Sequence, residues 1–207
     1  MKERKLSKRE QHRKEEFDKL IEQMKQNNYE INKLTIGVGY ANVMGLVIML
    51  PFVVLFYLLF TQVNPNISFV LSLTKCFIFL CLIPIFMVLH EMIHGILFAR
   101  YAKHRFQSVD FGIIWKMLTP YCTCKDPLKK SSYIIALIMP TVVLGFILAI
   151  FATIIQSALL LILAELMMIG GGGDFLILTK LLSYHSNKKE QLFYDSPYEI
   201  GLVVFEK

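Results

Sequence analysis

The chain has 207 residues, of which 55% are hydrophobic, and its mean hydropathy is +0.53. Charged residues make up 18% of the chain and crowd into a few stretches, a composition that fits a multi-spanning membrane protein and excludes the soluble classes. The formal net charge is +6, but basic residues beside apolar spans are topology signals, and no nucleic-acid-binding motif accompanies them. We therefore expect a lipid bilayer around this chain and no nucleic-acid partner.

Residues 1–35 form a charged segment that we predict to be cytosolic. Apolar residues recur there at helical spacing between lysines and glutamates, namely Phe17, Leu20, Ile21 and Met24. This spacing predicts a short helix, which either lies along the membrane surface or is an ordinary solvated helix. The rest of the chain divides into a transmembrane domain, residues 36–183, and a cytosolic tail, residues 184–207.

Four apolar stretches follow the charged segment, and each is long enough to cross a hydrocarbon core of about 30 Å as a helix: residues 39–61, 76–98, 132–155 and 158–182. The predicted fold class is therefore all-α, a polytopic membrane protein with about four transmembrane helices. Ten of the 22 Lys and Arg residues precede Leu34, and seven lie from Arg100 to Lys130. Because cytosolic flanks carry the excess of positive charge, both termini and the 100–131 loop are predicted to be cytosolic.

His90, Glu91 and His94 lie inside the second apolar stretch in the pattern His-Glu-x-x-His. An ionisable group near the bilayer core costs about 2.5 to 3.5 kcal/mol on insertion scales, so such groups face an interior and mark function. On a helix this spacing places both imidazoles on one face. In zinc hydrolases the two histidines hold the metal and the glutamate is the general base. The alternative is a pair of histidines that only pack within a helical bundle.

A third metal ligand must lie at the depth of the two histidines. Counted from the outer ends of their spans, His90 and His94 lie about 22 to 28 Å down and Asp174 about 26 Å down. Four glycines, residues 170–173, precede Asp174, and a membrane tolerates such an interruption where backbone lines a cavity or packs closely. Asp174 is therefore the predicted third ligand. Glu165 lies about two and a half turns nearer the outside and is the second choice.

Pro140 and Gly95 are two further positions for which the sequence suggests a role. Pro140, in the third span, lacks an N–H group and so frees a backbone carbonyl near the cytosolic half. That carbonyl could shape a substrate groove, or the proline could be an ordinary kink of a transmembrane helix. Gly95, directly after the second histidine, is predicted to be a close-packing position.

Together these features resemble the site-2 protease class of membrane-embedded zinc metalloproteases, and within it the putative zincin peptidase family of small bacterial four-span proteins. The resemblance covers about residues 76–182 and rests on HEMIHG at 90–95, YCTCKDPL at 121–128, the span with Pro140, and GGGGD at 170–174. It implies zinc held by His90, His94 and Asp174, with Glu91 activating a bound water. It also implies a place in the bacterial cytoplasmic membrane.

The function expected from the sequence is hydrolysis of peptide bonds in a membrane-anchored protein substrate near its cytosolic interface. Two alternatives remain open. One is a non-proteolytic membrane accessory protein with a structural metal site, although such a site needs no general base. The other is a metal or small-solute transporter, which four spans without an inverted repeat do not favour unless a homo-oligomer supplies the rest.

Overall fold

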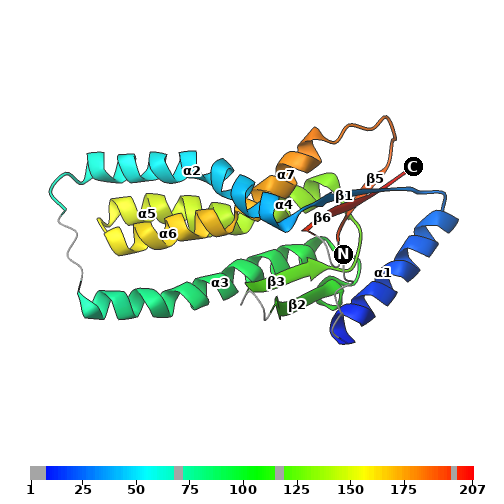
Figure 1. Cartoon of the computed structure of the whole chain (residues 1–207), viewed down its shortest axis with the longest axis horizontal. Helices are drawn as coiled ribbons and strands as arrows, with labels where there is room; N and C mark the ends of the chain where they lie inside the picture. The colour runs from blue at the N-terminus through cyan, green and yellow to red at the C-terminus, as the bar shows by residue number, and fades with distance from the viewer. Residues whose placement is uncertain (1–7, 68–71, 115–118, 197–199) are drawn as a thin grey trace.

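The structure is a computed structural model that describes residues 8–67, 72–114, 119–196 and 200–207. A bundle of long helices occupies one end of the molecule, and most of the strands lie at the other end (Figure 1). The helices are α1 Lys8–Gln26, α2 Val38–Val63, α3 Leu73–Tyr101, α4 Lys130–Thr141, α5 Leu148–Ile154, α6 Ala158–Gly170 and α7 Gly172–Ser183. The strands are β1 Glu30–Ile36, β2 Val109–Ile114, β3 Thr119–Cys124, β4 Leu128–Lys129, β5 Gln191–Asp195 and β6 Ile200–Glu206.

The four predicted apolar spans are helical in the structure. By length and composition α2, α3 and the continuous stretch Lys130–Ile154 could each cross a membrane. The stretch Lys130–Ile154 joins α4 to α5 through a π-helical turn, Val142–Ile147. The fourth span is broken at Gly171 into α6 and α7, which are bent by 42° relative to each other. The bend falls within the glycine run that the sequence marked as an interruption.

The all-α prediction is confirmed only in part: the chain is mostly helical, but six strands form two antiparallel sheets among the described residues. A four-stranded sheet has the order β1-β6-β5-β4, and a separate hairpin pairs β2 with β3. The central pairing joins β1, the strand just before the first long apolar helix, to the last strand, with Glu30 opposite Glu206 and Ile36 opposite Ile200. Such pairing depends on contacts between residues about 170 positions apart, which local periodicity does not reveal. The sheet thus packs at one end of the helices, while the cytosolic location of both termini stays a prediction.

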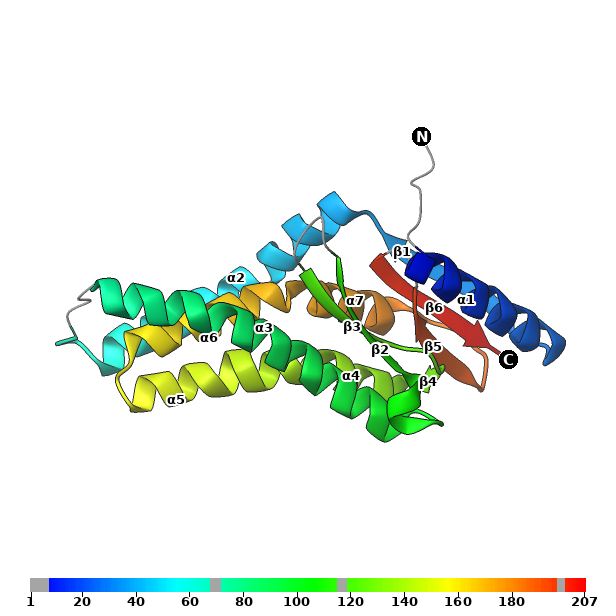
Figure 2. The same cartoon turned by 90° about the horizontal axis from the view of Figure 1, so that it is seen from below.

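The four-stranded sheet is buried on both faces, as the alternation along β6 shows. Leu202 and Val204 face the ends of the helices, where they pack with Phe98 of α3 and Tyr133 of α4. The neighbouring residues of β6 point the other way and pack under α1, together with its apolar residues: Phe17, Leu20, Ile21, Met24, Val203 and Phe205. The apolar side of α1 therefore packs on the sheet (Figure 2), while the position of α1 relative to a membrane stays a prediction.

Within the bundle, α2 and α7 cross so closely that their backbones are in contact. A Cβ atom built on Gly172 would lie 2.6 Å from the carbonyl oxygen of Gly45, and one built on Gly171 would lie 1.8 Å from Oγ1 of Thr141. A Cβ atom built on Gly170 or Gly173 would meet no atom of another described element within 4 Å. The glycine run thus serves close helix packing at two of its four positions, and this packing sets where α7 begins.

Gly172→Ala is expected to lower the thermal midpoint of the protein in detergent, because the new methyl group collides with the α2 backbone. Overpacking of this kind costs about 1 to 3 kcal/mol. Gly173→Ala is the matched control and is expected to leave the midpoint unchanged or raise it, because alanine favours a helix by about 1 kcal/mol. Circular dichroism on heating measures both, and equal midpoints for the two variants would contradict the close approach.

Candidate metal centre

The second half of α3 carries both histidines and Glu91. His90 and His94 lie one helical turn apart, and their rings meet edge to face with centroids separated by 4.9 Å. Both residues are buried, with only 9% and 5% of their surfaces exposed. The two imidazoles therefore point together into the interior of the bundle.

Asp174 lies in the first turn of α7, directly after the bend in the fourth span. Its Oδ2 atom is 3.2 Å from Nε2 of His90 and 3.4 Å from Nε2 of His94. One candidate ligand atom from each of the three residues lies within 4.8 Å of the other two. The structure thus brings together the three residues that the sequence selected as ligands.

The donor set and its spacing fit zinc. Zinc binds histidine nitrogen at about 2.0 to 2.1 Å and carboxylate oxygen at about 2.0 to 2.2 Å, in a tetrahedral arrangement. Two atoms at about 2.1 Å from a tetrahedral ion are about 3.4 Å apart, and Asp174 lies 3.2 and 3.4 Å from the two histidines. Three protein ligands also leave a fourth position for water, as catalytic zinc sites have. The group of His90, His94 and Asp174 could therefore bind a metal ion.

Glu165, the second choice for the third ligand, is not part of this group. It lies in α6, on the other side of the bend from Asp174. Its Oε1 atom is buried and has no hydrogen-bond partner among the described residues. The geometry therefore favours Asp174, and the structure gives Glu165 no part in the candidate centre.

A backbone carbonyl of α4 fixes the orientation of His94. The Nδ1 atom of His94 lies 2.8 Å from the carbonyl oxygen of Ala136. Because a carbonyl only accepts hydrogen bonds, Nδ1 carries a proton and donates it, and Nε2 is the nitrogen that faces Asp174. Phe98 stacks on the same ring with an interplanar angle of 15°. The sequence did not single out Ala136, because a carbonyl group is common to every residue type.

The β2–β3 hairpin covers Glu91, and sequence reasoning missed it by treating these residues as a loop. The backbone of Cys122 in β3 lies beside the Glu91 carboxylate. The Phe111 ring lies against α3 at Gly95, where an added Cβ atom would come 2.1 Å from the ring. This contact confirms the prediction that Gly95 is a close-packing position, and it seats the hairpin on the helix that carries the histidines.

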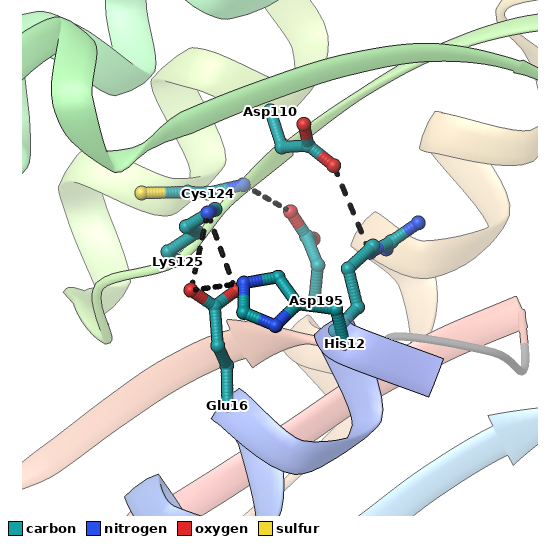
Figure 3. A network of polar contacts seen from close by, with 7 residues as sticks. His12, Glu16, Asp110, Cys124, Lys125 and Asp195 are labelled. Carbon is teal, nitrogen blue, oxygen red and sulfur yellow. Dashed lines mark hydrogen bonds and ion pairs between the residues drawn. The ribbon is translucent and has the colours of Figure 1, made fainter. Parts of the chain in front are cut away.

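Ion pairs from α1 attach to the same hairpin (Figure 3). Arg13 lies 3.9 Å from Asp110 of β2, and Glu16 lies 3.2 Å from Lys125, directly after β3. The helix at the start of the chain therefore holds the outer side of the hairpin that lies over Glu91.

The hairpin approaches the candidate centre with its backbone, and its two thiols are not expected to bind the metal. Burial raises the pKa of Cys124 to about 12 and holds the pKa of Cys122 far above its usual range. Both thiols are therefore protonated at neutral pH, whereas the thiolate is the form that binds metals. The Cys124 N–H donates to Oδ2 of Asp195 at 3.2 Å, so the tail strand β5 also fixes the hairpin.

Comparison with known proteins adds one finding. Residues 82–188 match a family model described as "Putative zincin peptidase", a match of 107 of the 207 residues that includes all four predicted site residues. No curated protein and no solved structure matches the chain at a significant level. The chain therefore belongs to the putative zincin peptidase family.

Proposed function

We propose that this protein is a membrane-embedded zinc metalloprotease of the site-2 protease type, which cleaves a membrane-anchored protein near the cytosolic face of the bacterial cytoplasmic membrane. The convergence of His90, His94 and Asp174, with Glu91 in the same helical turn, is the observation that carries the proposal. The family match supports a zinc peptidase in general. The membrane location and the substrate are part of the proposal.

The surfaces of α2 and α3 support a membrane location. Apolar side chains on both helices are exposed along most of their length, a surface that water does not favour and lipid does. Examples are Val43, Leu50, Leu58, Phe77, Leu80 and Val88. The candidate centre lies toward the end of α3 that meets the sheet, so water would reach it from that side.

The roles of the residues follow from their chemistry. His90, His94 and Asp174 would hold zinc, which when bound polarises the scissile carbonyl and makes water a nucleophile near neutral pH. Glu91 accepts the proton of the attacking water and delivers it to the leaving amine. The backbone of Cys122 lies beside Glu91 and would help to keep its carboxylate in place for both transfers. The substrate must be unwound at the cleavage point, because the amides of an intact helix are closed by their own hydrogen bonds.

Purified protein is expected to contain about one zinc ion per chain, and His94→Ala and Asp174→Ala are each expected to lose it, because two ligands do not complete the site. Glu165→Gln is the matched control and should keep its zinc. Elemental analysis of detergent-purified protein measures the content. A folded native protein without zinc would rule out the hydrolase, whereas zinc loss in Glu165→Gln alone would move the third ligand to α6.

Glu91→Gln is expected to keep zinc but to reduce proteolysis by about 10²- to 10⁴-fold, the usual contribution of a general base. The readout is cleavage of a co-expressed single-span reporter with an unstructured segment next to the membrane, followed on immunoblots. Glu165→Gln again serves as the control. If Glu91→Gln cleaved as fast as the native protein, Glu91 would have no catalytic role, and zinc flux into sealed vesicles would then test the transporter.

A further inference from the structure

Pro140 lies four residues after Ala136 in α4, and this spacing matters for the hydrogen bonds of the helix. In an α-helix each carbonyl accepts a hydrogen bond from the N–H four residues later. Proline has no N–H, so the bond that any other residue at position 140 would donate to the Ala136 carbonyl is absent. The Ala136 carbonyl is also fully buried, because Ala136 exposes none of its surface, and it is therefore shielded from bulk solvent.

The imidazole of His94 donates a hydrogen bond to this buried carbonyl. Nδ1 of His94 lies 2.8 Å from the Ala136 oxygen, the distance of a well-formed hydrogen bond. The same ring presents Nε2 to Asp174 at 3.4 Å. The carbonyl left open by a proline in one span therefore orients a candidate zinc ligand in another span.

We propose that Pro140 is a positioning residue for the metal centre: it keeps the Ala136 carbonyl open so that His94 donates its Nδ1 proton there and turns Nε2 toward the metal. This inference rests on the proposed zinc site. The Ala136 carbonyl would orient the ligand His94 without contacting the metal itself. Groups of this kind influence metal affinity because they fix both the tautomer and the ring orientation of a histidine ligand.

Two contacts hold α4 in the register that this arrangement needs. One turn before Ala136, the Tyr133 hydroxyl donates a hydrogen bond to Asp195 of the tail strand β5. One residue after Pro140, Thr141 is fully buried and packs against Gly171 at the bend before Asp174. The segment from 133 to 141 is thus fixed at both ends, so the height of the open carbonyl relative to His94 is set by the fold.

A residue with an N–H at position 140 would compete with His94 for the same oxygen. Its amide would re-form the helical bond to Ala136 and draw that carbonyl into line with the helix axis. The imidazole would then share its acceptor or lose it. Pro140→Ala should therefore strengthen α4 as a helix while weakening the metal site, a combination that general destabilisation does not produce.

The test compares zinc affinity, measured by competition with a chelator in detergent, for the native protein, Pro140→Ala and Pro51→Ala. Pro51 lies within the apolar helix α2 and is the matched control for removal of a helical proline. We expect Pro140→Ala to bind zinc about 10- to 100-fold more weakly, the usual effect of losing an outer partner of a ligand, with helical content equal to or above native. Pro51→Ala should bind as the native protein does. Equal affinity of Pro140→Ala and native protein would overturn the proposal.

A second measurement uses the native chain and does not depend on the folding of any variant. Nitrogen NMR of protein labelled at histidine is expected to show His94 with a proton on Nδ1 that is shielded from exchange. A native His94 with no proton on Nδ1 would overturn the proposal. Absence of zinc from the native protein would instead defeat the proposed function, and the NMR result would still decide whether the carbonyl at 136 orients His94.

Discussion

Ionisable side chains inside an apolar helix bundle are unfavourable unless polar partners meet them. Each such group costs a few kcal/mol at the depth of a bilayer core. In this chain His90 and His94 from one helix meet Asp174 from another, with every candidate ligand atom within 4.8 Å of the others. The packing of α3, α4 and α7 can be understood as the arrangement that brings these groups to one point.

The convergence of these three residues depends on interruptions of the helices as much as on the helices themselves. The bend at Gly171 starts a new helix, so that Asp174 lies in a first turn instead of in the middle of a long span. Gly172 allows that new helix to touch the backbone of α2 at Gly45. In the third span a π-helical turn follows directly after α4. Interruptions of this kind lie where backbone approaches a site, as is usual in membrane proteins.

The part of the molecule outside the bundle fixes the centre from the other side. Strands β1 and β6, from opposite sides of the helices in the sequence, pair with each other, and the sheet they build packs on the ends of α3 and α4. From this sheet Asp195 reaches both Tyr133 of α4 and the backbone of Cys124 in the hairpin. The hairpin in turn brings the Cys122 backbone to Glu91. The sheet and the hairpin, which are polar flanking segments in the sequence, therefore support the buried site.

The sequence by itself determined the four apolar spans, the pairing of His90 with His94 on one helical face, and the depth at which Asp174 meets them, because hydropathy and the rise of a helix depend only on local order. It also marked the glycine run and Pro140 as interruptions. Only the tertiary structure decided the strands, the cover over Glu91 and the acceptor for His94. These depend on pairing between distant residues and on backbone groups that every residue carries, such as the carbonyl of Ala136. No residue type in the sequence encodes which of them will meet.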